Sequence, residues 1–330
     1  MKAAIWQRPG DLVIGERPDP APGPEDIVVR VGACGLCGTD LHIADGDFPP
    51  APYPLVPGHE FAGEVVAVGA GAGEVREGMH VAVDPSLYCG RCEYCRAGRG
   101  NLCAHWGAIG DTVDGAFAEY VKVPAANAYP LPDHLSDREG ALVEPVSCAV
   151  RGLHRLQVQP GERALVLGAG TMGLLLLQLL VRAGASSVAV VDANAAKLPR
   201  AERLGASAVH TDASELAAPV DMAVDATGVP AAIEAAFGAL RRGGRLLVFG
   251  VAPSDAQVSL SPFRIYNDEI AILGSMAILH SFGPALDLVA GGAIDTAEML
   301  TDEFPLERFA DALANVRGGG GVKSQVLPHA

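Results

Sequence analysis

Apolar and polar residues alternate in short runs through the first 150 residues of the chain. Residues 27–31 read Ile-Val-Val-Arg-Val and residues 64–68 read Glu-Val-Val-Ala-Val, and clusters of Gly and Pro separate runs of this kind. Alternation with a period of two is typical of strands, and Gly and Pro are typical of the turns between them. The pattern predicts an all-β unit, similar to a barrel, made of many short strands.

From residue 163 onward, apolar strands alternate with helical segments. The expected strands cover residues 164–167, 187–191, 221–225 and 245–249. The helical segments between them cover residues 171–183, 195–204 and 231–240. Strands that are separated by helices form βαβ units, so this part of the chain predicts a parallel sheet.

The last part of the chain contains two more helical patterns and a final strand. The helical patterns lie near residues 284–290 and 306–316, and the strand covers residues 322–327. We expect this tail to complete the first domain, so that the parallel-sheet domain is an insertion. The expected first domain comprises residues 1–150 and 287–330, and the expected second domain comprises residues 151–286.

Composition and charge narrow the classes of function. The chain has 330 residues, of which 49% are hydrophobic, enough for two cores of ordinary size. Its net charge of −15 repels phosphate backbones and anionic lipids, which argues against nucleic-acid and membrane partners. The N-terminus has no signal-peptide pattern, and the longest apolar run, residues 174–181, is too short to cross a bilayer. The seven cysteines, with metal-like spacing, suit a reducing cytoplasm.

Four of these cysteines form a tight cluster. Cys89, Cys92, Cys95 and Cys103 follow the spacing C-x2-C-x2-C-x7-C. Four thiolates at this spacing can close around one Zn²⁺ and leave no position for substrate, so we interpret the cluster as a structural zinc site. The alternatives are two disulfides or four unrelated thiols. Disulfides are disfavoured because nothing in the sequence indicates secretion.

A glycine-rich motif opens the second domain. Residues Gly168-Ala169-Gly170-Thr171-Met172-Gly173 read G-x-G-x-x-G, directly after an expected strand and at the start of an expected helix. In this context Gly168 permits a tight turn, Gly170 admits a pyrophosphate, and Gly173 allows close packing of helix and strand. The helix N-terminus offers N–H groups to the phosphates. The motif predicts a dinucleotide site, and the alternative is a tight turn without ligand.

An acidic residue follows the second expected strand of this domain. Asp192 lies 19 residues after Gly173, and its carboxylate can bind both ribose hydroxyls and repel a 2′-phosphate. The sequence therefore favours NAD over NADP. Lys197 is expected near the adenosine end of the cofactor, with a solvated helix lysine as the alternative.

A second metal site is expected around Cys37 and His59. The segment 37–42 follows an expected strand, residues 58–60 precede another, and Glu144 lies near the domain junction. One Cys, one His and one or two carboxylates, here Glu60 and Glu144, suit a zinc ion that keeps an open position. The alternative is ordinary core packing, because an isolated His or Cys is more often a packed residue.

The residues next to Cys37 are suited to moving a proton. A zinc ion beside a nicotinamide can act as a Lewis acid on an alcohol that gives up hydride. We expect Thr39 to accept a hydrogen bond from the alcohol and His42 to deliver the proton to solvent. Asp40 is expected to hydrogen-bond the non-ligating nitrogen of His59. The alternative for Thr39 and Asp40 is a helix N-cap pair.

Taken together, these motifs resemble the zinc-dependent medium-chain alcohol dehydrogenases, and within them the polyol branch of sorbitol- and arabitol-like enzymes. The resemblance extends along the whole chain. The residues that carry it are 37–42, 58–60, the four-cysteine cluster, Gly115-Ala116-Phe117-Ala118-Glu119-Tyr120, Glu144-Pro145, and the glycine motif with Asp192. It implies an α/β protein with a β-rich, GroES-like catalytic domain and a Rossmann domain with a doubly wound parallel sheet.

The resemblance also implies roles for single residues. It makes Cys37 and His59 ligands of a catalytic zinc, with Glu60 or Glu144 as the third ligand. It places the nicotinamide half of the cofactor along Thr227, Phe249, Gly250, Val251, Gly274, Ser275 and Met276. It implies a homo-oligomer, a tetramer or a dimer, joined through the Rossmann sheets. Two departures stand out: Arg151 occupies a position where many relatives have His, and Ala277 one where sorbitol dehydrogenases carry Arg.

The sequence thus predicts a cytoplasmic enzyme with NAD and two Zn²⁺ ions per chain. It would transfer hydride from a secondary alcohol, within a polyol, to NAD and produce a ketone. One alternative is an NAD-binding, zinc-stapled protein without turnover, acting as a redox sensor or in a structural role. Another is a zinc-free quinone or enone reductase that uses NADPH.

Overall fold

The computed structural model describes residues 1–47 and 51–330, which divide into two compact units. The first unit comprises Met1–Ser147, Ile278–Gly291 and Met299–Ala330. The second comprises Cys148–Ala277 and Gly292–Glu298. The second unit is therefore inserted into the first, and the tail of the chain returns to the unit in which the chain began.

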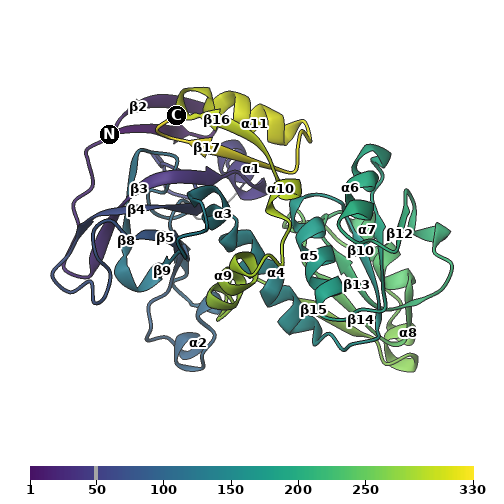
Figure 1. Ribbon diagram of the computed structural model, residues 1–330. Coiled ribbons are helices and arrows are strands. Elements are labelled where there is room, and N and C mark those ends of the chain that lie inside the picture. The colour runs from purple at the N-terminus through teal and green to yellow at the C-terminus, as the bar shows by residue number, and fades with distance from the viewer. Residues whose placement is uncertain (48–50) are drawn as a thin grey trace. The chain divides into compact units, whose positions relative to one another are not determined.

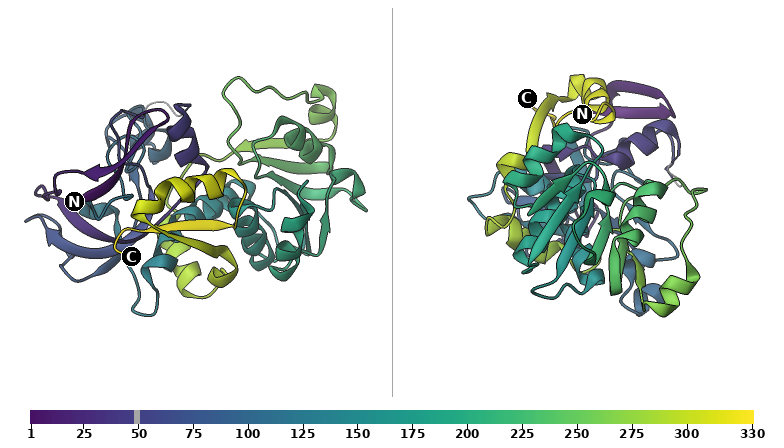
Figure 2. Two further views of the ribbon diagram at one scale, coloured as in Figure 1. Left: turned by 90° about the horizontal axis from the view of Figure 1, so that it is seen from above. Right: turned by 90° about the vertical axis from the view of Figure 1, so that its right-hand side faces the viewer.

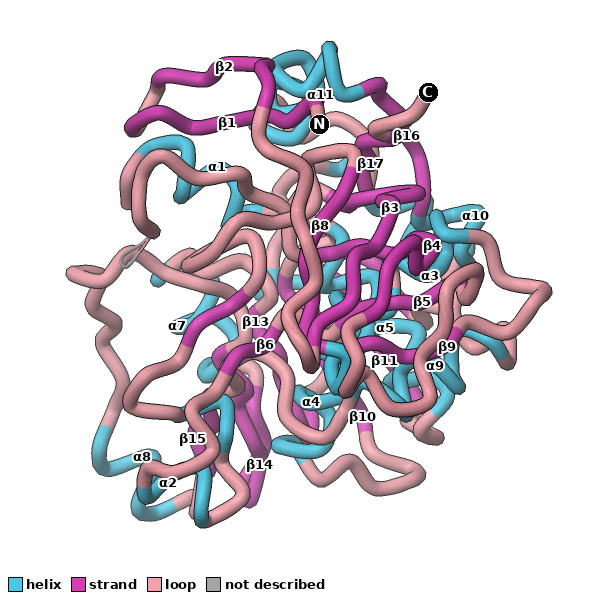
Figure 3. Tube along the Cα trace, turned by 90° about the vertical axis from the view of Figure 1, so that its left-hand side faces the viewer, coloured by secondary structure: helices cyan, strands magenta, loops and turns pink. Residues whose placement is uncertain are grey.

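A seven-stranded sheet forms the centre of the first unit (Figure 1). Its strands are β3 (Asp26–Gly35), β4 (Glu60–Val68), β5 (His80–Val83), β8 (Tyr120–Pro124), β9 (Ala128–Pro130), β16 (Leu300–Pro305) and β17 (Lys323–Leu327). The order is β16-β17-β3-β4-β5-β9, with β8 also paired to β3. All pairs are antiparallel except β16 with β17. Figure 3 shows β17, from the end of the chain, beside β3, from its beginning.

Smaller elements surround this sheet. Two short ribbons pair β1 (Lys2–Arg8) with β2 (Asp11–Glu16) and β6 (Ser86–Leu87) with β7 (Gly107–Ala108). The helices are α1 (Gly38–Asp45), α2 (Glu93–Arg96), α3 (Asp137–Ala141), α9 (Phe282–Ala290) and α11 (Phe309–Arg317). The prediction of a β-rich unit completed by the tail agrees with this architecture.

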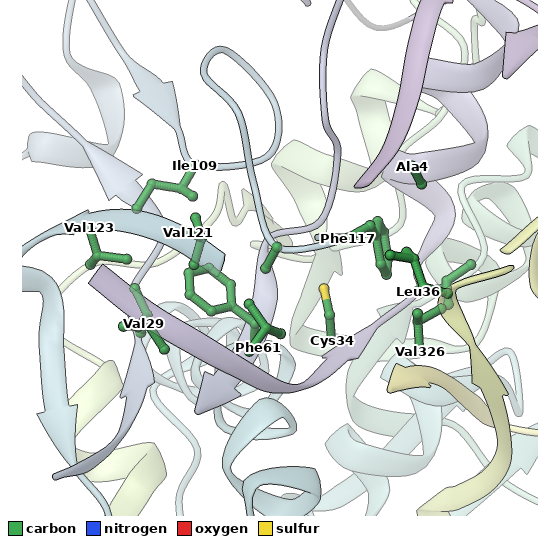
Figure 4. Close-up of a cluster of buried hydrophobic side chains, with 14 of the residues drawn as sticks. Ala4, Val29, Cys34, Leu36, Phe61, Ile109, Phe117, Val121, Val123 and Val326 are labelled. Carbon is green, nitrogen blue, oxygen red and sulfur yellow. The ribbon is translucent and has the colours of Figure 1, made fainter. Parts of the chain in front are cut away.

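The core of the first unit brings the two ends of the chain together. Phe61 of β4, Phe117 and Val326 of β17 are buried in one apolar cluster (Figure 4). The ring of Phe117 packs on the ring of Phe309 at a centroid distance of 4.6 Å. Burial of each large apolar side chain contributes about 1.5–3 kcal/mol. The tail is therefore held in the first unit by packing as well as by the pairing of β17 with β3.

The second unit contains a six-stranded parallel sheet with helices on both faces (Figure 2). Its strands are β10 (Arg163–Leu167), β11 (Ser187–Val191), β12 (Ala208–His210), β13 (Val220–Asp225), β14 (Leu240–Val248) and β15 (Ala271–Gly274). The order β12-β11-β10-β13-β14-β15, with every pair parallel, is the doubly wound order of dinucleotide-binding folds. The prediction of a Rossmann-type sheet is confirmed.

Helices lie on both faces of this sheet, and successive residues of β10 contact different ones. The helices are α4 (Val143–Leu156), α5 (Thr171–Arg182), α6 (Leu198–Arg203), α7 (Pro230–Gly238), α8 (Pro262–Asn267) and α10 (Thr296–Met299), of which α4 begins and α10 ends in the first unit. Successive side chains of a strand point to opposite faces. Val166 faces α5 at Gly173, whereas Leu165 and Leu167 share a buried cluster with Ile233 of α7.

Several element boundaries differ from the sequence prediction. The strands β12 and β15 were not predicted, because β12 has only three residues and β15 is largely exposed and lacks a buried apolar run. The helix expected at 231–240 ends at Gly238, and Leu240 already begins β14. The helix expected at 306–316 begins at Phe309, after a 3-10 turn. Across residues 1–47 and 51–330, every helix is too short or too polar to span a bilayer.

Candidate metal and cofactor sites

The four cysteines predicted to bind structural zinc do converge. The Sγ–Sγ distances are 3.5 Å for Cys92 and Cys95, 3.9 Å for Cys92 and Cys103, and 3.5 Å for Cys89 and Cys103. Tetrahedral ligation with Zn–S bonds of about 2.3 Å requires sulfurs about 3.8 Å apart. A disulfide requires about 2.05 Å, so these thiols are not paired as disulfides. The donor set and its spacing fit one zinc ion with four sulfur ligands.

Backbone N–H groups around this cluster stabilise negative charge on sulfur. The N–H of His105 donates to Sγ of Cys103 at 3.2 Å, and the N–H of Cys89 donates to the same sulfur at 3.4 Å. N–H groups of Cys95 and Ala104 lower the pKa of Cys92 to about 6. Because the thiolate is the form that binds zinc, these N–H groups favour the ligand state of Cys92.

A second cluster forms where β3 ends and β4 begins. The strand register pairs Gly35 with Glu60, which brings the segment after β3 next to the start of β4. Sγ of Cys37 lies 3.2 Å from Nε2 of His59, and Glu60 belongs to the same group, with ligand atoms within 4.8 Å of one another. Tetrahedral zinc would hold this sulfur and nitrogen about 3.6 Å apart. A sulfur and an imidazole nitrogen at this spacing fit two ligands of one zinc ion.

Cys37 also begins helix α1. Its Sγ accepts a hydrogen bond from the N–H of Thr39 at 3.2 Å, and Oδ2 of Asp40 accepts one from the N–H of Cys37 at 2.9 Å. The N-cap is therefore Cys37, and Asp40 completes a capping box with it; the N-cap alternative for Thr39 and Asp40 is right for the capping role of Asp40 but not for Thr39 as the cap residue. Asp40 is fully buried, and burial raises its pKa to about 6. Thr39 is half-buried in the first turn of α1, and His42 is exposed one turn later.

The partner of the second imidazole nitrogen is Asp111 rather than Asp40. Oδ1 of Asp111 lies 3.3 Å from Nδ1 of His59, and both side chains are buried. The predicted role of Asp40 at His59 is therefore wrong, because Cys37 and Asp111 are the neighbours of the two ring nitrogens of His59. Burial would lower the pKa of His59, but the charges of Cys37 and Asp111 raise it well above its ordinary value. A carboxylate behind a ligating imidazole fixes which nitrogen faces the metal.

A buried ion pair adjoins this cluster. Nζ of Lys323, on β17, donates to both carboxylate oxygens of Glu60 at 2.8 and 2.6 Å and to the carbonyl oxygen of Leu36 at 2.8 Å. Both side chains of the pair are only 2% exposed. Burial would lower the pKa of Lys323, but the negative charges of Glu60, Cys37 and Glu144 raise it. Glu144 is buried in the first turn of α4.

In the second unit, the glycine motif adopts the conformation that its sequence predicts. Gly168 has φ +104°, and a Cβ at Gly173 would collide with the carbonyl oxygen of Gly168. Gly170 is the N-cap of α5 and has open space around its Cα. Thr171 and Met172 therefore lie in the first turn of α5. This is the geometry that receives a phosphate group.

The predicted ribose carboxylate lies beside this loop. Oδ2 of Asp192 accepts the N–H of Ala169 at 2.8 Å, and Oδ1 accepts the N–H of Asn194 at 2.8 Å. Nζ of Lys197 lies 4.0 Å from Oδ2 of Asp192. Hydrogen bonding to the glycine motif thus orients the carboxylate that is predicted to bind the ribose of the same cofactor.

Asp225, which the sequence analysis missed, organises the next turn. Its Oδ1 accepts hydrogen bonds from the N–H and the hydroxyl of Thr227 at 2.9 and 2.6 Å. A Cβ at Gly250 would collide with the backbone of Thr227 and Gly228, so the two loops are in close contact. The other residues predicted along the nicotinamide half follow the carboxyl ends of two strands. Phe249, Gly250 and Val251 follow β14, and Gly274, Ser275 and Met276 end or follow β15.

Comparisons with known proteins agree with both predicted domains. Residues 23–133 match the family model of the alcohol dehydrogenase GroES-like domain, and residues 171–291 match that of the zinc-binding dehydrogenases. The chain is 36% identical to D-arabinitol dehydrogenase 1 of Uromyces fabae, over 100% of this chain and 97% of that protein. It is 34% identical to sorbitol dehydrogenase of Bacillus subtilis (strain 168), over 95% of this chain and 92% of that protein.

Solved structures show the same fold with nicotinamide cofactors. A zinc-binding dehydrogenase from Sinorhizobium meliloti 1021, bound to NADP, is 36% identical with a TM-score of 0.96, and the match covers 99% of each chain. An alcohol dehydrogenase (rspB) from E. coli CFT073, complexed with NADH, is 29% identical with a TM-score of 0.92, again over 99% of each chain. The predicted GroES-like and Rossmann domains are confirmed.

Proposed function

Because the chain belongs to the zinc-binding medium-chain alcohol dehydrogenase family, we propose that it oxidises a secondary alcohol within a polyol to a ketone, with NAD as hydride acceptor. The observation that carries the proposal is the trio of half-buried Cys37 with buried His59 and Asp111. A sulfur and an imidazole nitrogen 3.2 Å apart, with a carboxylate behind the imidazole, make an unusual core contact but a suitable metal site.

In this proposal Cys37 and His59 hold the catalytic zinc, and Glu60 or Glu144 provides the third ligand. Zinc supplies Lewis acidity toward the alcohol oxygen, and the nicotinamide accepts the hydride. Asp111 orients His59, and Lys323 neutralises the charge of Glu60. The carboxylates of Asp111 and Glu60 can therefore both be buried near the thiolate of Cys37. The four-cysteine cluster holds the second, structural zinc.

We assign proton transfer to helix α1. Thr39, in the first turn of α1, would accept the hydrogen bond of the substrate hydroxyl. His42, exposed one turn later, would pass the proton to solvent. Asp40 serves this arrangement indirectly, because its hydrogen bond to the N–H of Cys37 holds the start of α1.

For the cofactor, we propose NAD bound by the glycine motif and by Asp192, with Lys197 near the adenosine. A carboxylate at the end of β11 favours ribose hydroxyls and disfavours a 2′-phosphate. The S. meliloti structure contains NADP and the E. coli structure contains NADH, so relatives of this fold bind either cofactor. The proposed preference therefore depends on Asp192 itself. The nicotinamide half would follow Thr227, the loop after β14 and the loop after β15.

We also propose that the protein is a cytoplasmic homo-oligomer, a dimer or a tetramer. The cytoplasmic location is supported by cysteine sulfurs that are spaced for metal binding. The assembly is supported by β15, which is the last strand of its sheet and leaves Ile272 40% exposed. Nearby in sequence, Phe263 and Tyr266 of α8 are 72% and 83% exposed. A second copy that pairs with β15 would cover a free strand edge of this kind. Light scattering of the purified protein measures the number of chains.

A panel of simple secondary alcohols, diols and sugar alcohols, assayed by NADH absorbance, tests the activity. Cys37→Ser should abolish turnover and leave the circular dichroism spectrum unchanged. Cys148→Ser, at a cysteine outside both clusters, is the control and should keep turnover. If no alcohol is oxidised while NADH still binds, the protein is a cofactor-binding protein without turnover. If quinones or enones are reduced with NADPH instead, the zinc-free reductase is the correct alternative.

A further inference from the structure

Most basic side chains of this acidic protein are paired with a carboxylate. Of the 24 lysines and arginines, all of them described residues, 17 have a side-chain nitrogen within 4.0 Å of a carboxylate oxygen. The seven arginines without such an ion pair are Arg76, Arg91, Arg96, Arg99, Arg151, Arg155 and Arg182. In a chain with 39 acidic residues, a cation without an acidic partner needs an explanation.

Five of these arginines are explained by their surroundings. Arg91, Arg96 and Arg99 are exposed in the four-cysteine loop, where their charges offset the thiolates. Arg76 is exposed to solvent. Arg182 donates hydrogen bonds to the carbonyl oxygens of Ala293 and Gly292 at 3.1 and 2.8 Å. Arg151 and Arg155 remain.

Arg151 and Arg155 lie one turn apart on α4. Nε of Arg155 donates to the carbonyl oxygen of Gly274 at 3.0 Å, which anchors this side chain at the end of β15. Nε of Arg151 is buried and has no hydrogen-bond partner. Burial and the neighbouring charge of Arg155 both lower the pKa of Arg151. Two like charges one turn apart destabilise a helix slightly, and a buried unpaired donor adds a further cost.

The packing of α4 places this pair at the carboxyl edge of the parallel sheet. Gly152, between the two arginines, contacts the residue that follows β14, since a Cβ there would lie 3.1 Å from the ring of Phe249. Arg155 reaches Gly274, the last residue of β15. The hydroxyl of the next residue, Ser275, is also buried without a partner. Ligands of doubly wound folds bind outside the carboxyl ends of the strands.

We propose that Arg151 and Arg155 form a binding site for a phosphate or carboxylate group at this edge of the sheet. An anion there forms an ion pair with the guanidinium of Arg151 and offsets its repulsion from Arg155. It also accepts a hydrogen bond from the hydroxyl of Ser275. Arginine suits this role because its planar donor fork matches both groups. The inference rests on the proposed dehydrogenase function, which supplies two sources of such a group. These are the phosphate on the nicotinamide side of the cofactor, since the nicotinamide half is proposed to follow Ser275, and an acidic or phosphorylated position on the alcohol substrate.

The first arm of the test measures cofactor binding without turnover. NADH is titrated into zinc-loaded wild-type protein and into Arg151→Gln, and binding is followed by nicotinamide fluorescence. If the cofactor supplies the anion, the Kd rises about 10–100-fold, the effect of losing a hydrogen bond to a charged group. Arg76→Gln, which removes an equally unpaired but exposed arginine, is the matched control and leaves the Kd unchanged. Arg155→Gln, at an exposed position, repeats the test where folding is not at risk.

The second arm compares two substrates that differ only in an anionic group. These are a sugar alcohol and its phosphate ester, or the corresponding sugar acid, assayed with saturating NAD. If the substrate supplies the anion, Arg151→Gln lowers kcat/KM about 10–100-fold for the anionic substrate alone. Arg151→Lys keeps the positive charge but loses the planar set of guanidinium donors. It should therefore retain part of the affinity for the anion, whether the cofactor or the substrate supplies it.

Stability separates a binding role from a structural one. Because Arg151 buries an unsatisfied donor in the free protein, Arg151→Gln should leave the melting temperature unchanged or raise it. A lower melting temperature together with unchanged NADH affinity and an unchanged kcat/KM ratio would overturn the inference. If the wild-type protein itself fails to bind NADH, the proposed function and this inference are both refuted. If every variant binds NADH normally and no variant lowers kcat/KM for the anionic substrate alone, the inference is refuted and the proposed function stands.

Discussion

Replacement of Lys323 tests the buried ion pair beside the Cys37–His59 site. Lys323→Met keeps the length of the side chain and removes the charge that faces Glu60. Nζ lies 2.6 and 2.8 Å from the two carboxylate oxygens, and both side chains are 2% exposed. At an effective dielectric constant of about 20, unit charges at this separation attract each other by about 6 kcal/mol. Much of this attraction only offsets the desolvation of the two ions.

The cost of the substitution comes from the charge that is left behind. Glu60 stays buried without its ammonium partner, and removal of one partner of such a pair costs about 3–5 kcal/mol. This is a large share of the roughly 5–15 kcal/mol that stabilises a typical domain. Because Lys323 is on β17 and Glu60 on β4, the loss should appear in the unfolding of the first unit.

Urea unfolding of the zinc-loaded protein, followed by circular dichroism, measures this effect. Lys323→Met should lower the free energy of unfolding by about 3–5 kcal/mol, and Lys323→Met combined with Glu60→Gln should recover a substantial part of it. Lys2→Met is the matched control, because Lys2 forms an equally short but exposed pair with Glu307 at 2.5 Å, and little change is expected. A loss below about 1 kcal/mol for Lys323→Met, or a double variant as unstable as the sum of the singles, would contradict the reasoning.

Three further predictions concern zinc and cofactor. Wild-type protein should contain two zinc ions per chain by elemental analysis, whereas Cys95→Ser should contain one and melt at a lower temperature; a second zinc retained in Cys95→Ser would argue against the four-cysteine site. Asp111→Asn should weaken zinc binding at Cys37 and His59 about 10–100-fold in competition with a chelator, with exposed Asp133→Asn as the unchanged control. Equal affinity of the two proteins would remove Asp111 from the site. Asp192→Ala should raise kcat/KM with NADP relative to NAD, and an unchanged ratio would refute the ribose assignment.

The roles of residues that lie in compact motifs could be predicted from the sequence. The four cysteines, the glycine motif and the segments around Cys37 and His59 each place several functional groups within a short stretch of chain. Spacing and local conformation are then enough to predict which atoms meet. The alternation of strands and helices from residue 163 predicted the parallel sheet for the same reason, since βαβ order follows from neighbouring elements.

Residues that reach a site through contacts between distant parts of the chain could not be predicted from the sequence. Lys323 meets Glu60 across 263 positions of sequence, and only the pairing of β17 with β3 brings it there. Asp111 lies in the loop after β7, three residues before Asp114, and no spacing in the sequence relates it to His59. Asp40 lies three residues after the predicted ligand Cys37, and its Oδ2 accepts the N–H of Cys37, whereas Asp111 lies beside His59.

The position of β17 at the far end of the chain has a consequence during synthesis. Residue 326 pairs with residue 34, so the ribosome must add about 290 residues before the edge of β3 finds its partner. At about 5–20 residues per second this delay lasts about 15–60 s. Throughout that interval the nascent polypeptide carries Glu60 without Lys323. A stop codon or a proteolytic cut before residue 323 would therefore impair a site whose proposed metal-binding side chains were all translated long before.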